Sequence, residues 1–545
     1  MKSFPKLKTR FFILIAILIS SFMRFACAEN LDDTFPAEFS LASLNGKNGF
    51  VIKGINGSGG SIGSSVSGAG DINGDGIADI LIGAPDAIKG AGQTYIIFGS
   101  DKGWPSALNI DHINNGLIVN GVNDGDHSGY SVSKAGDFNG DGIDDILISA
   151  PQANNSAGQS YVLFGNKQGL PLEINLSDLD GNNGFTINCS LVGAKECGIA
   201  LYGGGDFNGD GIADILLGTQ DIATYVVFGG RKQWPATIDL LKVNGTDGFA
   251  IRGKNGIVGI LGYSVTSIGD INADSIADIL IMVAVNTVMR NFVLFGSKRE
   301  WPAVFDISDS NGINGFFIDG LRNGHPRKNA VGDVNGDGID DLWLADGSES
   351  IVSHIVFGSK EQWPAAIDIT TLDSDKGFAI KGFKKAWYFV QGGRGDVNGD
   401  GIDDMLIGGV ARSDLGESYV VFGRKKWPET INVTNLDGNN GFVIRSLKKG
   451  DLLGSSLCIA KDINGDGIDD ILINAPNVLQ TGGQTYVVFG RAKKTYDWLT
   501  AVISTVVLLS MGICTGYTCY LYYSHAPIPS PPTTTPTITD PLIIY

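Results

Sequence analysis

Side-chain oxygens recur at a fixed spacing in a nine-residue pattern, whose second copy runs from Asp137 to Asp145. Each copy has carboxylate or amide side chains at positions 1, 3, 5 and 9, and all copies but one have glycine at positions 4 and 6. Glycine lets the backbone coil tightly and turn its carbonyl oxygens inward, and calcium prefers oxygen ligands of these kinds. The pattern therefore predicts calcium loops. The seven copies begin at Asp71, Asp137, Asp206, Asp270, Asp333, Asp396 and Asp462.

The loops are expected to join strands rather than helices. An EF-hand needs a bidentate Glu at position 12 and a helix on each side, whereas position 12 is Ile82 in the first copy and Ile148 in the second. The apolar run around each of these residues is β-branched and too short for a helix. The alternative is an acidic surface turn without metal, and the sevenfold recurrence counts against it.

Three further patterns recur between the loops. One is a strand that ends in Phe-Gly, as at 95–99, another is Trp-Pro a few residues later, as at Trp104, and the third is an apolar strand opened by Asn-Gly-Phe, as at 183–187. Each repeat of 63 to 69 residues thus contains four short strands separated by Gly-rich turns. Four strands in each of seven units are typical of an all-β, seven-bladed β-propeller.

The phase of the repeats indicates how the ring closes. The last repeat ends at its Phe-Gly strand, 486–490, and an extra Asn-Gly-Phe strand, 48–52, precedes the first loop. We therefore expect the N-terminal strand to complete the last blade, which removes an exposed sheet edge.

The unit from Gly70 to Pro85, followed by Gly92 to Gly99, resembles the FG-GAP repeat of integrin α-chains, and the resemblance extends over residues 36–490. It implies calcium in the hairpin between strands 1 and 2 on the lower face, with ligand contacts on the upper face. The implied metal ligands are the side chains of positions 1, 3, 5 and 9 and the carbonyl of position 7. They are Asp71, Asn73, Asp75, Ile77 and Asp79; Asp137, Asn139, Asp141, Ile143 and Asp145; Asp206, Asn208, Asp210, Ile212 and Asp214; Asp270, Asn272, Asp274, Ile276 and Asp278; Asp333, Asn335, Asp337, Ile339 and Asp341; Asp396, Asn398, Asp400, Ile402 and Asp404; and Asp462, Asn464, Asp466, Ile468 and Asp470.

The fourth loop departs from this pattern. Ala273 and Ser275 replace its two glycines, and a residue other than glycine at positive φ costs about 1 kcal/mol or more. We expect the weakest calcium site there.

Other features differ from an integrin α-chain. No leg domains follow the propeller, no von Willebrand-type insertion lies between blades, and the tail has no Gly-Phe-Phe-Lys-Arg element. Pairing with an integrin-type β-subunit is therefore not expected. The tripeptide Arg394-Gly395-Asp396 matches the one that integrins recognise on their ligands, but Asp396 is also position 1 of the sixth loop, so we interpret the match as accidental.

Composition limits the partners. Glycine accounts for 77 residues, the net charge is −18, and no basic stripe interrupts the acidic repeats. A nucleic-acid backbone would be repelled by this charge, so nucleic acid is excluded as a partner. Cys189 and Cys197 flank one predicted loop and are candidates for a small disulfide in an exported protein.

The sequence predicts an export segment at the N-terminal end of the chain and a membrane anchor near the C-terminal end. Residues 1–28 have the basic, apolar and Ala-x-Ala regions of a secretory signal, and acylation of Cys27 in a bacterial lipoprotein is the alternative. Residues 29–495 form the expected propeller, uncharged residues 498–523 a single-pass transmembrane helix, and 524–545 a short disordered tail rich in Pro and Thr. The basic residues before the helix favour the opposite orientation by the positive-inside rule, but the signal places the propeller outside.

No catalytic constellation is evident. The five histidines have no metal spacing, and neither a Gly-x-Ser-x-Gly elbow nor a phosphate-binding loop occurs. We expect a cell-surface protein that is not an enzyme, holds calcium and binds an extracellular protein or glycan in adhesion, as integrin α-chains do. The alternative is a surface enzyme on the same scaffold, such as a polysaccharide lyase.

Overall fold

The computed structural model describes residues 34–492, apart from 55–61, 190–194, 221–222, 254–257, 286–287, 322–329, 346–351, 384–387, 411–414 and 479–481. The predicted signal segment, transmembrane helix and tail lie outside these residues. Within them, no helix is long and apolar enough to cross a membrane.

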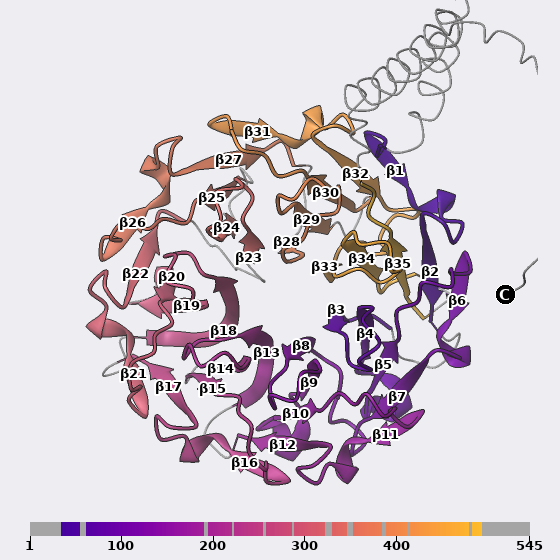
Figure 1. The fold of residues 1–545 in the computed structure, drawn as a ribbon, viewed down its shortest axis with the longest axis horizontal. Helices are drawn as coiled ribbons and strands as arrows, with labels where there is room; N and C mark the ends of the chain where they lie inside the picture. Colours follow the sequence, from indigo (N-terminus) through magenta and orange to yellow (C-terminus); the bar gives the residue numbers. More distant parts are fainter. Residues whose placement is uncertain are drawn as a thin grey trace, which may run out of the picture. The chain divides into compact units, whose positions relative to one another are not determined.

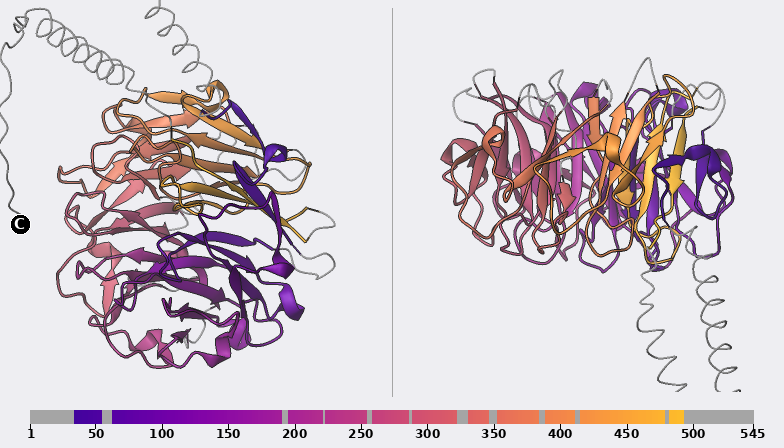
Figure 2. Two further views of the ribbon diagram at one scale, coloured as in Figure 1. Left: turned by 45° about the vertical axis from the view of Figure 1, so that its right-hand side comes forward. Right: turned by 90° about the horizontal axis from the view of Figure 1, so that it is seen from above.

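Seven five-stranded sheets surround a common axis (Figure 1). The predicted all-β, seven-bladed propeller is therefore confirmed. In every blade the first four strands pair antiparallel with their neighbours, and a fifth strand pairs parallel with the fourth. Figure 2 shows the sheets side by side around the ring, with connecting loops on two opposite faces.

The three inner strand positions recur in every blade, from the first blade to the seventh. The innermost strands are β3 (Ser65–Gly70), β8 (Val132–Gly136), β13 (Lys195–Gly205), β18 (Val258–Gly269), β23 (Ala330–Gly332), β28 (Tyr388–Gln391) and β33 (Leu457–Ala460). The second strands are β4 (Asp79–Ala84), β9 (Asp145–Ala150), β14 (Asp214–Gln220), β19 (Asp278–Val285), β24 (Asp341–Ala345), β29 (Met405–Val410) and β34 (Asp470–Ala475). The third strands are β5 (Gln93–Ile97), β10 (Gln159–Leu163), β15 (Thr224–Val227), β20 (Val288–Leu294), β25 (Ser353–Val356), β30 (Glu417–Val421) and β35 (Gln484–Val488).

The outer part of each blade contains two more strands. The fourth strands are β7 (Gly116–Asn120), β12 (Gly184–Asn188), β17 (Gly248–Arg252), β22 (Gly315–Asp319), β27 (Gly377–Lys381), β32 (Gly441–Arg445) and β2 (Gly49–Lys53). The fifth strands are β11 (Glu173–Asn175), β16 (Thr237–Asp239), β21 (Val304–Asp306), β26 (Ala366–Asp368), β31 (Thr430–Asn432), β1 (Glu38–Ser40) and β6 (Ala107–Asn109). The expectation of four strands per unit missed the fifth, because a three-residue strand is too short to show a period of two.

Short helical turns complete the described structure. A 3-10 turn follows each fifth strand: η1 (Leu41–Ser43), η2 (Ile110–His112), η3 (Leu176–Asp178), η4 (Leu240–Lys242), η6 (Ile307–Asp309), η7 (Ile369–Thr371) and η8 (Val433–Asn435). Two four-residue turns, α2 (Ala87–Gly90) and α3 (Ala153–Ser156), lie between the second and third strands of the first two blades.

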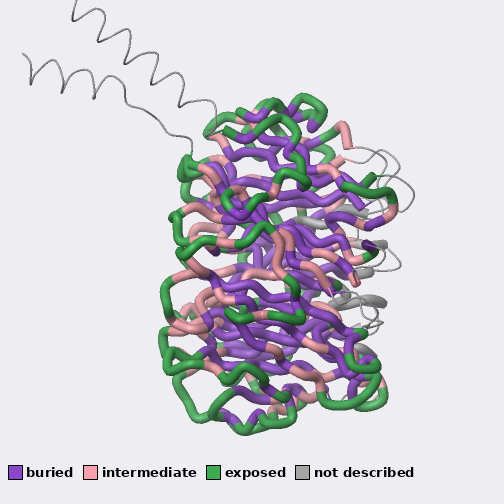
Figure 3. The backbone as a smooth tube through the Cα atoms, turned by 90° about the vertical axis from the view of Figure 1, so that its right-hand side faces the viewer, coloured by how far each residue is buried: buried purple, intermediate pink, exposed green. Residues whose placement is uncertain are grey.

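The hydrophobic core lies between neighbouring blades. One cluster, for example, joins Leu81 and Ile96 of the first blade to Ile146 and Ile148 of the second. Apolar side chains of the second and third strands point to both faces of each sheet, so these strands read as continuous apolar runs rather than alternating ones. Figure 3 shows the buried residues along the strands and the exposed ones on the loops and outer edges.

The Trp-Pro and Asn-Gly-Phe patterns meet in space. Each Trp ring reaches back to the preceding blade and stacks on the Phe ring of its fourth strand, as Trp104 does on Phe50 with ring centroids 4.3 Å apart. Equivalent stacks join Phe185 to Trp234, Phe249 to Trp301, Phe316 to Trp363 and Phe378 to Trp427. At these five interfaces the aromatic stacks therefore hold one repeat onto the one before it.

The N-terminal segment closes the ring with two strands. The predicted closure is confirmed, because β2 pairs antiparallel with β35 and completes the seventh blade. In addition, β1 pairs parallel with β32 of the sixth blade, and the Phe35 ring stacks on Phe442 with centroids 4.2 Å apart. Phe35-Pro36 thus takes the place that Trp-Pro has in other blades.

Phe35→Ala should destabilise the closed ring. Phe35 is buried and lies on Phe442 and Phe39, and truncating a buried Phe costs about 3–5 kcal/mol. We expect a lower urea midpoint and a lower melting temperature. Phe35→Trp is the matched control, because Trp fills this position in other blades, and it should melt close to the wild type. An unchanged midpoint for Phe35→Ala would show that this contact does not hold the ring closed.

Candidate metal centres

Each acidic loop connects the first and second strands of one blade. The loop at 71–79, for example, follows β3 and ends where β4 begins. The same connection recurs in every blade, so all seven loops lie on one face of the propeller, which we call the loop face. The structure therefore brings each set of five predicted residues together within its own hairpin, and it does not bring different sets together into one site.

Side chains at positions 1, 3 and 5 turn into their own loop. In the first loop, Asp71 Oδ1 accepts the N–H of Asp75 at 3.0 Å and Asp71 Oδ2 accepts the N–H of Gly76 at 2.7 Å. Asn73 Oδ1 accepts from Asp75 N at 2.9 Å, and Asp75 Oδ1 accepts from Ile77 N at 2.9 Å. These hydrogen bonds hold several oxygens around the same turn.

The carboxylate at position 9 is fully buried and ties the loop to the third strand. Asp79 Oδ2 accepts the N–H of Ile72 at 2.9 Å, and its Oδ1 accepts the N–H of Gly99 at 2.8 Å. Gly99 is the glycine of the Phe-Gly pattern, and a Cβ there would lie 2.3 Å from the carbonyl oxygen of Ala78. The equivalent carboxylates are those of Asp145, Asp214, Asp278, Asp341, Asp404 and Asp470.

Burial makes these carboxylates hard to ionise without a counter-charge. Desolvation raises the pKa of Asp79 from 3.8 to about 7, although backbone N–H groups lower it, and the nearby charges of Asp75 and Asp71 raise it further. For the same first reason, the pKa of Asp341 rises to about 8. The pKa values of Asp145, Asp214, Asp278, Asp404 and Asp470 are likewise raised by burial.

The loops suit a hard cation. Asp137 Oδ1 is buried and accepts no hydrogen bond within the described structure, and the surrounding donors are carboxylate, amide and carbonyl oxygens, which calcium prefers. Across the described ranges, no three His, Cys, Asp or Glu side chains already converge on one point, and position 9 is turned to backbone amides. The full ligand set expected from the sequence stays a prediction.

The fourth loop keeps the same geometry without its glycines. Ala273 has φ of 60° and Ser275 φ of 68°, and Asp270 still accepts the N–H groups of Asp274 and Ser275. The expectation that these two residues are forced to positive φ is therefore confirmed.

The Arg394-Gly395-Asp396 tripeptide is engaged within the propeller. Arg394 Nη1 lies 2.7 Å from Asp340 Oδ1, and Asp396 accepts the N–H groups of Gly399 and Gly401 through its two carboxylate oxygens. Both charged side chains thus have structural contacts, in line with our interpretation of the tripeptide as accidental.

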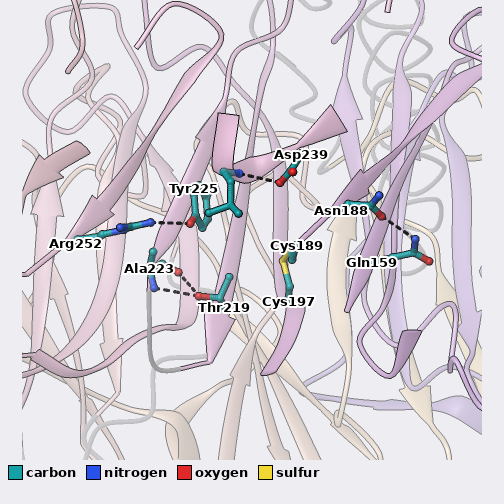
Figure 4. The surroundings of a disulfide bond; sticks show 10 residues. Gln159, Asn188, Cys189, Cys197, Thr219, Ala223, Tyr225, Asp239 and Arg252 are labelled. Carbon is teal, nitrogen blue, oxygen red and sulfur yellow. Dashed lines mark hydrogen bonds between the residues drawn. A yellow bond between two sulfur atoms is a disulfide. The ribbon is translucent and has the colours of Figure 1, made fainter. Parts of the chain in front are cut away.

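A disulfide joins Cys189 and Cys197, whose Cα atoms are 6.1 Å apart (Figure 4). Cys189 follows β12 of the second blade and Cys197 lies in β13 of the third. The bond therefore ties two neighbouring blades. Cys458 is buried in β33.

The sequence did not predict the contacts made by aspartates at position 8 of four loops. These aspartates are Asp144, Asp340, Asp403 and Asp469, and each contacts the preceding loop. The only sequence clue is that position 8 is Asp in these copies and Ala in the other three.

Comparison with known proteins agrees with the fold. The FG-GAP repeat matches residues 62–97, 128–163 and 453–488. Bovine phosphatidylinositol-glycan-specific phospholipase D is 32% identical over 27% of this chain and 17% of its own length. Integrin alpha-5 of Xenopus laevis is 29% identical over 30% of this chain and 15% of its own length, and mouse integrin alpha-IIb is 28% identical over 31% and 16%. The chain thus covers less than a fifth of the length of these relatives.

Restoring glycine should strengthen the fourth loop. In Ala273→Gly/Ser275→Gly, removing two strained φ values should stabilise the loop by about 1 kcal/mol per residue and tighten its calcium binding. Calorimetric titration should find that the weakest site of the wild type is lost in the variant. As a control, Gly74→Ala/Gly76→Ser in the first loop should create a second weak site. Seven equivalent sites in the wild type would rule this account out.

The stability of the calcium-free protein should fall as the pH rises. The folded-state pKa values of Asp79 and Asp341 lie above the ordinary 3.8, so the folded protein binds more protons than the unfolded chain between pH 3.8 and about 8. The free energy of unfolding that these protonated carboxylates contribute below pH 3.8 is therefore lost as the pH rises to about 8.

Bound calcium would replace these protons, so the melting temperatures with calcium and with chelator should diverge as pH rises. Scanning calorimetry across this pH range measures the gap between the two melting temperatures. Asp79→Asn, which cannot ionise, should show a weaker pH dependence in chelator. A gap that is constant with pH would contradict the linkage.

Proposed function

Because the chain carries FG-GAP repeats in a seven-bladed propeller similar to integrin alpha chains, we propose that it is a membrane-anchored, calcium-binding protein for cell adhesion. It binds an extracellular protein or glycan and is not itself an enzyme. The observation that carries this proposal is the repetition of one cation-suited hairpin in every blade, on one face of a closed ring. That arrangement stabilises a scaffold and leaves the opposite face for binding.

Calcium has a structural role in this proposal. Each loop supplies its own oxygens, and the buried position 9 carboxylates gain a counter-charge when a cation binds nearby. Seven separate loops distributed around a ring fit stabilisation better than catalysis at a single centre.

The opposite face offers an exposed apolar surface at the first two blades. Ile88 lies in α2 with φ of 49° and is 51% exposed, although positive φ is unfavourable for a β-branched residue. The loop at 121–131 contributes exposed Val122 and Tyr130. The two loops are joined, because His127 N donates to Gly90 O at 2.8 Å. Strained, exposed apolar residues on linked loops are typical of a binding surface.

The chain enters and leaves the propeller on the loop face. Thr34 and Arg491 line one small hollow together with Asn398 and Asp400 of the sixth loop, and Arg491 N donates to Val397 O at 2.9 Å. Both described chain ends therefore lie on the loop face. The opposite face is free of them, and it is the face that we propose for ligand binding.

A surface enzyme is the second candidate. The similarity to a phospholipase D named for phosphatidylinositol-glycan favours it, but the match covers only 17% of that protein, and fold alone does not fix activity. A polysaccharide lyase is the other form of this alternative. Each would need catalytic groups beyond the acidic loops.

A binding screen separates the two candidates. The full chain, purified with detergent, is applied to arrays of matrix proteins and glycans with calcium or with a chelator, while the masses of any products are recorded. We expect calcium-dependent retention of one ligand class without cleavage. Ile88→Asp should reduce retention, whereas Leu172→Asp, an exposed leucine on the outer edge, should not. Turnover of the ligand would overturn the adhesion proposal.

A further inference from the structure

The seven loops are hydrogen-bonded to one another in a closed ring. The N–H of position 8 in each loop donates to the carbonyl of position 1 in the preceding loop, as Asp340 N does to Asp270 O at 3.2 Å. The ring closes because Ala78 N of the first loop donates to Asp462 O of the last at 2.9 Å. Position 1 is the first predicted cation ligand, so every loop's ligand is held by its neighbour's backbone.

Four interfaces add a side-chain contact to this ring. The carboxylate of position 8 accepts the N–H of position 1 in the preceding loop: Asp144 from Asp71 at 2.9 Å, Asp340 from Asp270 at 2.9 Å, Asp403 from Asp333 at 3.0 Å, and Asp469 from Asp396 at 3.1 Å. At the other three interfaces position 8 is Ala78, Ala213 or Ala277. Two classes of loop therefore exist, one held by backbone alone and one held also by a carboxylate.

The residue before position 1 shows how closely this carboxylate packs. Gly269 has φ of 75°, and a Cβ on it would lie 1.9 Å from Asp340 Oδ2. Gly70 and Gly332 meet Asp144 and Asp403 in the same way, at 2.1 and 2.0 Å. A side chain at these glycines would displace the carboxylate from the amide that it holds.

Two of these carboxylates are also paired with a cation. Arg394 Nη1 lies 2.7 Å from both carboxylate oxygens of Asp340, and Lys461 Nζ lies 3.1 Å from Asp469 Oδ2. The Asp340 and Asp469 side chains are only 15% exposed, so the pairs fix their orientation. Arg394 thus fixes the Asp340 carboxylate, and this carboxylate in turn accepts the N–H of Asp270.

We propose that Asp340, oriented by Arg394, is a positioning residue for the cation of the fourth loop, and that Asp144, Asp403 and Asp469 do the same for the loops they contact. The inference rests on the proposed calcium function. The fourth loop needs this support most, because it lacks the two glycines that the others have. Arg394, which precedes the sixth loop, therefore acts through Asp340 of the fifth loop on the cation loop of the fourth.

Calcium titration of the full chain tests the proposal. Replacing a residue that orients a metal ligand typically weakens metal binding 10–100-fold, so Asp340→Ala should weaken one calcium site by about that factor. Asp340→Asn keeps an acceptor for the Asp270 amide and should weaken the site less. Arg394→Gln should also weaken it. Calorimetry with calcium chloride gives the affinities, and melting temperatures in chelator give the calcium-free stability.

The outcomes distinguish a residue that positions a calcium ligand from one that only ties neighbouring blades together. A tie would lower the melting temperature equally with calcium and with chelator and leave every affinity unchanged, which would overturn the proposal. Asp247→Ala is the matched control, because it removes an ion pair with Lys232, 2.6 Å long, between two residues outside the seven acidic loops. This variant should leave all calcium affinities unchanged. A wild type that binds no calcium would refute the proposed function itself.

A gain of affinity gives a second test that does not depend on Asp340→Ala folding. Ala213 occupies position 8 opposite Asp137, whose buried Oδ1 accepts no hydrogen bond in the described residues. Ala213→Asp should tighten the second loop's site several-fold, and Ala213→Asn should do so in part, because its amide oxygen can accept the same N–H. No change in either variant would contradict the proposal.

Discussion

Each blade has a buried aspartate carboxylate at the start of its second strand or directly before it. The ring depends on the contacts of this carboxylate. It accepts one N–H from its own loop and one from the glycine that ends the third strand, so it fixes the loop, the hairpin and the edge of the blade together. Because it is buried, its ionised form needs donors and a nearby positive charge. The same carboxylates thus shape the hairpin and, when ionised, require a nearby cation.

The second constraint is closure. Each repeat reaches back to its predecessor through a three-residue parallel strand, and in most repeats also through a stacked aromatic ring. This leaves the last two blades incomplete until the N-terminal segment supplies β1 and β2. Hydrogen bonds between successive loops run through the same closure, from Ala78 to Asp462. The predicted cation loops and the closure of the propeller are therefore parts of one continuous hydrogen-bonded ring.

Much of the fold could be predicted from the sequence, because repetition shows elements that a single copy would leave ambiguous. The loops, the four main strands and the closing strand β2 all follow from recurring patterns. Phe35 was missed because it is not a tryptophan, although its stack matches those of the other blades. Asp340 was missed because its partner lies 70 residues away, and a sequence pattern shows spacing within a repeat but no contact between repeats. The pairing of Cys189 with Cys197, a candidate from the sequence, is present in the structure.

The sequence predicted which residues make up each candidate metal site, but not which groups those residues contact. Spacing predicted the oxygens of positions 1, 3, 5 and 9 in each loop, yet the turn of position 9 toward two backbone amides depends on the third strand, which no local pattern describes. The face that we propose for ligand binding is less predictable still, because its loops do not repeat. Ile88 became a candidate only when its backbone conformation and exposure were seen together.

Counting the bound cations tests the central claim, that calcium in the seven loops ties this ring together, most directly. Native mass spectrometry of the full chain in calcium should show species with up to seven ions, the last of them added only at higher calcium concentration, and a chelator should remove them all. A mass equal to that of the bare polypeptide at millimolar calcium would contradict the account.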